Sequence, residues 1–108
     1  MSKASKVVDV RYAVPEKQAI FDIFNSIANN QEIKMTQNEA SVMSGILART
    51  KTSPKTTDFE RHHLESIKSV VSQTLDNINA LPEEERKEYE EFGGVLQNVI
   101  NKTNRALE

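Results

Sequence analysis

Apolar residues recur at steps of three and four in the second half of the chain, which predicts two amphipathic helices. The first stripe comprises Leu64, Ile67, Val71, Leu75, Ile78 and Leu81. The second comprises Tyr89, Phe92, Leu96, Val99, Thr103 and Ala106. Pro82 separates the two helices and is expected to begin the second. The pattern therefore predicts a long antiparallel helical hairpin over residues 58–108.

Local signals place the ends and the weak point of this hairpin. Thr57-Asp58-Phe59-Glu60 has the spacing of a capping box and is expected to begin the first helix. Gly93-Gly94 interrupts the second stripe. Two glycines in a helix cost roughly 2 kcal/mol relative to alanines, so we expect a kink, a break or a close helix approach there.

Polar and apolar residues alternate from Val7 to Val14, which predicts a strand. Val8, Val10, Tyr12 and Val14 share the face expected to be buried. A single strand leaves its backbone groups unpaired, and no second strand is evident in the sequence. The economical partner is the same strand of a second subunit. An extended arm packed on the helices, or the first turns of a helix, are the alternatives.

Two shorter helices are expected next. Pro15 begins one with a broad apolar face that favours burial on more than one side, and this helix is expected to end at Asn29-Asn30. Thr36-Gln37-Asn38-Glu39 fits a capping box and begins the other, which ends near Arg49. Gly45 inside the second helix would allow another helix to approach closely.

Together these elements predict a mainly α fold: a short N-terminal strand or extended arm, two short helices, then the long antiparallel helical hairpin. We divide the chain into a strand-helix-helix module at 1–50 with an arm at 1–6, a linker at 51–57, and the hairpin at 58–108. The hairpin is interpreted as an oligomerisation or partner-binding unit whose apolar stripe is only partly covered within one chain.

Composition narrows the class of protein. The 108 residues contain no Cys, which excludes disulfides, thiolate metal sites and cysteine nucleophiles. There is no apolar run long enough to span a membrane and no signal peptide, so a cytoplasmic protein without a membrane partner is expected. Residues 1–57 hold eight Lys/Arg and five Asp/Glu, whereas residues 58–108 hold six and eleven. The charge is therefore +3 in the first part and −5 in the second.

Candidate catalytic and metal-binding groups are few. His62 and His63 are adjacent, and neighbouring helical positions diverge by roughly 100°, so we expect no shared metal. His63 is expected to pack against the core and His62 to face solvent. The glutamates near Glu84, Glu88 and Glu91 lie on a solvated face rather than in a cleft, so paired-carboxylate catalysis is not expected. The sequence indicates a non-enzymatic protein without a cofactor.

The order of strand, proline, helix, connector and capped helix resembles the ribbon-helix-helix family of DNA-binding proteins. Three segments carry the resemblance: Val8-Asp9-Val10-Arg11-Tyr12, Pro15-Glu16-Lys17-Gln18-Ala19-Ile20 and Thr36-Gln37-Asn38-Glu39-Ala40. The stretch VDVRYAVPEKQAI is similar to the ribbon-to-helix junction of relaxosome accessory proteins. The resemblance covers residues 6–50 and implies paired strands from two subunits inserted into the DNA major groove.

The resemblance also implies roles for particular residues. Arg11 would contact guanine or phosphate, and Asp9 on the same face would accept a hydrogen bond from cytosine. The start of the second helix, at Thr36, Gln37 and Asn38, would bind a phosphate. Lys3 and Lys6 would add salt-dependent affinity.

Two functional hypotheses follow. The first is a regulator or accessory protein that binds double-stranded DNA as a homo-oligomer, either a dimer or a tetramer. The second is a helical protein–protein interaction module, such as an adaptor, inhibitor or assembly factor, that does not bind DNA. In the second hypothesis the acidic residues Glu84, Glu88 and Glu91 contact the partner.

Overall fold

The computed structural model describes residues 7–51 and 58–108 and confirms the mainly α fold. The elements in chain order are β1 (Val7–Asp9), α1 (Val14–Asn29), α2 (Gln37–Lys51), β2 (Asp58–Glu60), α3 (Arg61–Asn79), α4 (Glu83–Glu88) and α5 (Glu90–Leu107). The predicted arm, residues 52–57 of the predicted linker, and the predicted DNA contacts Lys3 and Lys6 lie outside the described residues.

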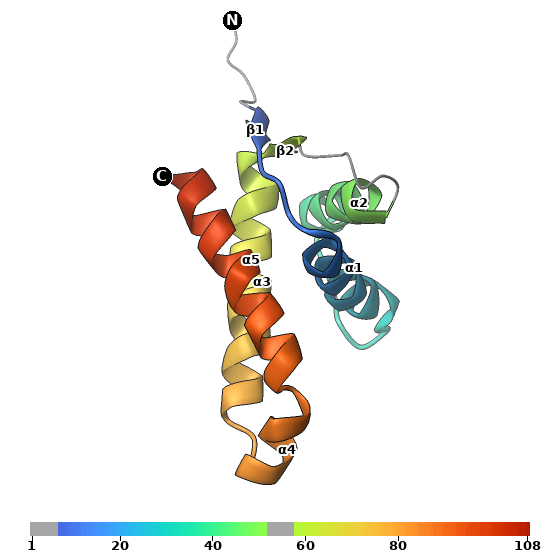
Figure 1. The fold of residues 1–108 in the computed structure, drawn as a ribbon. Coiled ribbons are helices and arrows are strands. Elements are labelled where there is room, and N and C mark those ends of the chain that lie inside the picture. Colours follow the sequence, from blue (N-terminus) through green and yellow to red (C-terminus); the bar gives the residue numbers. More distant parts are fainter. Residues whose placement is uncertain (1–6, 52–57) are drawn as a thin grey trace, which may run out of the picture.

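The predicted hairpin is present, with α3 and α5 packed side by side and α4 at its tip (Figure 1). The helix breaks at Tyr89, between α4 and α5, and not at the glycine pair. A Cβ on Gly93 would lie 3.6 Å from Leu75 Cδ1, so Gly93 faces α3 at ordinary contact distance. Gly94 has no such neighbour within 4 Å, which places it on the open side of α5.

The strand pairs within the chain, so the expectation that it needs a second subunit is wrong. β1 and β2 are antiparallel, with Val7 opposite Glu60 and Asp9 opposite Asp58. The predicted helix start at 57–60 is also wrong, because Asp58–Glu60 is extended and pairs with the backbone of β1 along one edge. Helix α3 begins one turn later, where Nδ1 of His63 accepts a hydrogen bond from the Glu60 amide at 3.2 Å.

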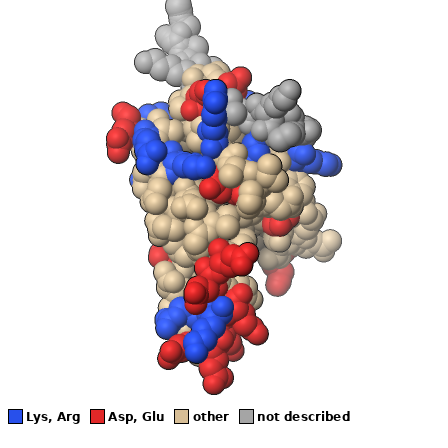
Figure 2. All heavy atoms as spheres, viewed as in Figure 1, with Lys and Arg blue, Asp and Glu red and all other residues tan. Residues whose placement is uncertain are grey.

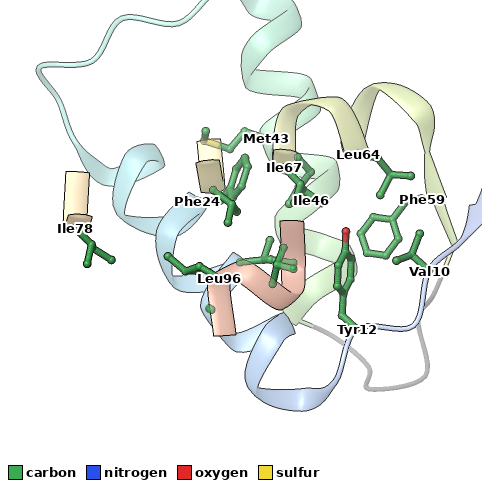
Figure 3. Close-up of a cluster of buried hydrophobic side chains, with 14 residues drawn as sticks. Val10, Tyr12, Phe24, Met43, Ile46, Phe59, Leu64, Ile67, Ile78 and Leu96 are labelled. Carbon is green, nitrogen blue, oxygen red and sulfur yellow. The ribbon is translucent and has the colours of Figure 1, made fainter. Parts of the chain in front are cut away.

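One hydrophobic core joins the two parts of the chain that the sequence suggested as separate units. Tyr12 and Phe59 pack edge to face with ring centroids 5.5 Å apart (Figure 3). Val10 and Tyr12 are buried as predicted, but Val14 is 67% exposed because α1 has already begun there and the alternation of a strand no longer applies. Helix α1 packs against α2, α3 and α5, as its broad apolar face predicted.

The hairpin's apolar stripe is covered unevenly within a single chain. Tyr89 is 43% exposed, and four further members are only partly buried: Leu75, Leu81, Phe92 and Ala106. The fully buried members of the stripe are Leu64, Ile67, Val71, Leu96, Val99 and Thr103. These residues are buried because α3 and α5 pack against each other and because α1 packs against both.

Polar contacts fasten the segment before α1 to α5. The Tyr12 hydroxyl donates to Thr103 Oγ1 at 2.6 Å, and the Thr103 hydroxyl donates in turn to the Val99 carbonyl, also at 2.6 Å. Glu16 Oε1 accepts from the Ala13 amide and from Lys102 Nζ, each at 2.7 Å. The Tyr12–Thr103 and Glu16–Lys102 pairs join residues more than eighty positions apart in sequence, so they fix the tertiary arrangement rather than local structure.

Candidate functional site

A groove of two adjoining hollows lies between α3 and the helices α1 and α2. We call it the α3 groove. The first hollow, of about 350 Å³, is lined by Phe24, Ile27, Ile33, Lys34, Met35, Asn38, Glu39, Val42, Met43, His62, Ser66 and Val70. The second, of about 570 Å³, is lined by Ile23, Ser26, Ile27, Ser69, Val70, Gln73, Thr74 and Asn77. Ile27 and Val70 line both hollows, so the two lie next to each other along α3.

Apolar side chains that are only half-buried line the groove. Ile23, Ile27, Met35, Val42 and Val70 all pack against the core without being enclosed by it. Ile33, in the connector between α1 and α2, remains 42% exposed. An apolar surface of this kind, rimmed by polar residues, is typical of a site that binds another molecule.

The groove is elongated, and its lining differs between its two ends. It follows α3 from His62 to Asn77, which corresponds to roughly 22 Å at 1.5 Å per residue. The polar lining residues of the second hollow, among them Gln73, are uncharged. The first hollow adds Lys34, Glu39 and His62 near one end.

The residues proposed for DNA binding lie on two separate elements. Asp9 and Arg11 are exposed, as the predicted alternation requires. Thr36, Gln37 and Asn38 are also exposed, at the start of α2. No hydrogen bond or ion pair among the described residues joins these two groups.

The predicted capping box at the start of α2 is confirmed, and this affects its predicted role in binding phosphate. Thr36 Oγ1 accepts from the Glu39 amide at 3.1 Å, and Glu39 Oε1 accepts from the Thr36 amide at 2.9 Å. The Thr36 amide is therefore already hydrogen-bonded within the turn. Asn38 and Glu39 also line the α3 groove, so this turn borders the groove.

On the face shown in Figure 2, Lys and Arg lie mainly toward the end that holds the small sheet, whereas the end that holds α4 shows acidic residues interleaved with basic ones. Two cations toward this end have carboxylate partners. Arg49 Nη2 lies 3.8 Å from Glu60 Oε2, and Lys102 Nζ lies 2.7 Å from Glu16 Oε1. These pairs reduce the positive charge that this end presents to a polyanion such as DNA.

The three acidic residues proposed to contact a partner are all exposed, with Glu84 and Glu88 on α4 and Glu91 in the first turn of α5. Glu88 and Glu91 line a hollow of about 510 Å³ together with Pro15 and Gln18 of α1. The structure thus brings two of the three beside α1, away from the α3 groove.

The two histidines lie closer together than their sequence positions suggested. Their ring centroids are 4.4 Å apart, with the planes tilted by 53°. His63 is buried as expected, and its Nε2 sits where a Cβ on Gly45 would be 2.5 Å away, so Gly45 does permit the close approach of α2 and α3. Burial lowers the pKa of His63 to about 4, with smaller contributions from the charges of Arg49 and His62. The buried ring is therefore neutral near pH 7.

The side chains of Glu60, His62 and His63 form a cluster of oxygen and nitrogen donors. One potential ligand atom from each lies within 4.8 Å of those of the other two. The sequence did not predict this cluster because Glu60 was expected to lie in a helix. In the structure Glu60 ends β2 and caps the first turn of α3.

The α3 groove was also missed, since it depends on how α1 and α2 lie against α3. The one sequence signal that pointed to it was the broad apolar face of α1. No helix among the described residues is long and apolar enough to cross a membrane. Comparisons of the chain with protein-family models, with curated proteins and with solved structures give no match.

Proposed function

We propose that this protein is a non-enzymatic helical interaction module that binds an amphipathic helix of a protein partner in the α3 groove. The observation that carries the proposal is the continuous line of half-buried apolar side chains between α1, α2 and α3. Covering them with the apolar face of a helix would remove them from water, at about 25 cal/mol per Å² of apolar surface buried.

Three properties of the groove favour a helix as its occupant. A length of roughly 22 Å matches four helical turns. Met35 and Met43 in the first hollow are flexible and polarisable, which suits the varied apolar side chains of a bound helix. Helices that dock in grooves present apolar residues at positions i, i+3, i+4 and i+7, which form one stripe along the groove.

The neutral lining of the second hollow adds a condition on the partner. Around Gln73 the polar lining residues carry no charge, so burial of a charged residue there would cost solvation without an opposite charge to offset it. We therefore expect a helix with uncharged residues beside its apolar stripe at that end.

Selection from a displayed library of 16-residue amphipathic helices tests the proposal. The immobilised chain should enrich sequences with apolar residues at the spacing given above, and selected peptides should bind with measurable heat in calorimetry. Ile33→Glu and Val70→Glu place a carboxylate in the groove and should reduce the affinity at least tenfold. Ile33 is partly exposed, so its replacement should leave the fold intact, as circular dichroism can verify.

Matched controls place binding at the groove. Val95→Glu makes the same change at a half-buried valine of α5, in the hollow beside α1, and should leave peptide affinity unchanged. Reversal of Glu84, Glu88 and Glu91 to lysine should also have no effect, because these residues lie elsewhere. Failure to enrich the apolar spacing, or equal loss of affinity in Val95→Glu, would contradict the proposal.

DNA binding by a homo-oligomer is the second candidate. The outward exposure of Asp9 and Arg11 beside the buried Val10 and Tyr12 favours it, because residues that read a DNA groove must be exposed. The pairing of β1 with β2 of the same chain departs from the two-subunit ribbon that the resemblance implies. The test is a mobility shift with mixed duplex fragments at two salt concentrations, together with the solution mass. Binding should weaken with salt and with Arg11→Ala. Binding that is indifferent to both would rule this candidate out.

A further inference from the structure

We propose that Glu60, His62 and His63 form a binding site for a divalent transition-metal ion, with Zn²⁺ as the ion that fits best. The donors are two imidazole nitrogens and one carboxylate, a set that zinc accepts. Each residue offers a ligand atom within 4.8 Å of the other two, close enough to converge on one ion after small side-chain rotations. This inference does not rest on helix binding, although His62 also lines the first hollow of the α3 groove.

Contacts with neighbouring residues keep two of the three side chains close to the site. His63 is 3% exposed and packs against Gly45, while its Nδ1 accepts the Glu60 amide hydrogen at 3.2 Å. Glu60 is held at its other oxygen, since Oε2 lies 3.8 Å from Arg49 Nη2. Arg49 is itself fixed by its hydrogen bonds to the Asp58 and Gly45 carbonyl oxygens, at 2.8 and 3.1 Å.

The other oxygen of Glu60 lies near the ring of His62. Glu60 Oε1 lies 3.8 Å from His62 Nδ1, slightly longer than the roughly 3.3 Å that separates two ligand atoms of a tetrahedral zinc ion at bond lengths of about 2.0 Å. The His62 side chain is 52% exposed, so it is free to turn toward an ion that enters from solvent. Oε1 of Glu60 would bind the ion, while Oε2 would stay beside Arg49.

Binding requires one rearrangement. The Nδ1 lone pair of His63 now accepts the hydrogen bond from the Glu60 amide, and it must turn from this amide to the ion. The positive charge of Arg49 also opposes a cation at this place. We therefore expect moderate affinity, with water completing the coordination, rather than the closed four-ligand shell of a structural zinc site.

The choice of ion follows from the ligands. Imidazole nitrogen suits zinc, copper and nickel, whereas magnesium prefers oxygen ligands and keeps most of its water. A site with two imidazoles and a single carboxylate should therefore discriminate strongly against Mg²⁺.

Calorimetric titration of the full chain without an affinity tag tests the site, with ZnCl₂ as the probe and MgCl₂ in a parallel titration. We expect one Zn²⁺ per chain and no heat from Mg²⁺. His62→Ala and Glu60→Gln should each weaken Zn²⁺ binding at least tenfold. Glu65→Gln is the matched control, because Glu65 is an exposed carboxylate on the same helix that pairs with Arg61 and lies outside the cluster.

A spectroscopic readout covers His63, whose replacement would disturb the core. In nitrogen-15 spectra of the imidazole rings, Zn²⁺ should shift the ring signals of both His62 and His63 in the wild-type chain. A shift of His62 alone would show adventitious binding to an exposed histidine and would overturn the proposal. Zn²⁺ affinity that is unchanged in Glu60→Gln, or the absence of any Zn²⁺ binding, would overturn it as well.

Discussion

The buried hydroxyl pair of Tyr12 and Thr103 gives the sharpest test of how the N-terminal segment is fastened to α5. Tyr12 is 5% exposed and Thr103 is fully buried, and each hydroxyl donates one hydrogen bond along the chain from Tyr12 through Thr103 to Val99. The two ends of the Tyr12–Thr103 bond are not equivalent, because removal of each partner leaves a different group without its bond.

Tyr12→Phe removes the donor. Thr103 keeps its bond to the Val99 carbonyl, so only one hydrogen bond is lost. The free energy of unfolding should therefore fall by about 1 kcal/mol. Thr103→Val keeps the shape of the side chain but leaves the Tyr12 hydroxyl buried without an acceptor. That change should cost about 2 kcal/mol, since a buried unsatisfied donor loses its solvation without compensation.

The double variant separates this explanation from simple loss of packing. With both hydroxyls removed, no unsatisfied group remains, so the double variant should be more stable than Thr103→Val alone. Urea unfolding followed by circular dichroism at 222 nm measures the three free energies of unfolding, and unchanged m-values would show that the variants unfold in the same way. The reasoning would be refuted if Thr103→Val were no more destabilising than Tyr12→Phe. It would also be refuted if the double variant lost the sum of the two single losses in free energy of unfolding.

Three further predictions concern the glycines, the buried histidine and the helix cap. Gly45→Ala should destabilise the fold by about 1–3 kcal/mol, because its Cβ would come within 2.5 Å of His63 Nε2. Gly94→Ala should stabilise the fold by about 1 kcal/mol, since Gly94 faces open space within α5. Thermal denaturation measures both glycine variants. Because the pKa of His63 is lowered from 6.5 to about 4, the unfolded chain binds the proton more readily, so stability should fall as the pH drops from 6.5 toward 4. The prediction would be contradicted if the urea midpoint stayed constant between pH 6.5 and pH 4. Thr36→Ala should cost about 1 kcal/mol through loss of the cap, whereas a loss within error in thermal denaturation would show that the cap contributes nothing.

The helices were readable from the sequence because their signals are local. The stripe from Leu64 to Ile78 predicted α3, and Thr36 with Glu39 predicted the start of α2, since both patterns act within a few turns. The burial of Val10 and Tyr12 also followed from alternation over a few residues. Where the local rule stopped applying, as at Val14, the prediction failed.

The candidate sites were less accessible to sequence reasoning because they combine distant segments. The α3 groove brings Met35 and Val42 beside Val70, and nothing in the spacing of these residues relates them. The histidine cluster depends on Glu60 ending a strand, which in turn depends on its partner in β1. The exposure of Asp9 and Arg11 was the part of the proposed DNA surface that a local pattern was able to predict.

By itself, the sequence determined that the chain forms amphipathic helices, approximately where they begin and end, and which of their faces are apolar. Only the tertiary structure decided what covers those faces. Phe59 was expected on a helix, yet it lies in β2, where the strand pairs with β1 and the Phe59 ring packs edge to face with Tyr12. Hydrogen bonds between strands and contacts between distant side chains form only when the whole chain folds, so no local pattern encodes them.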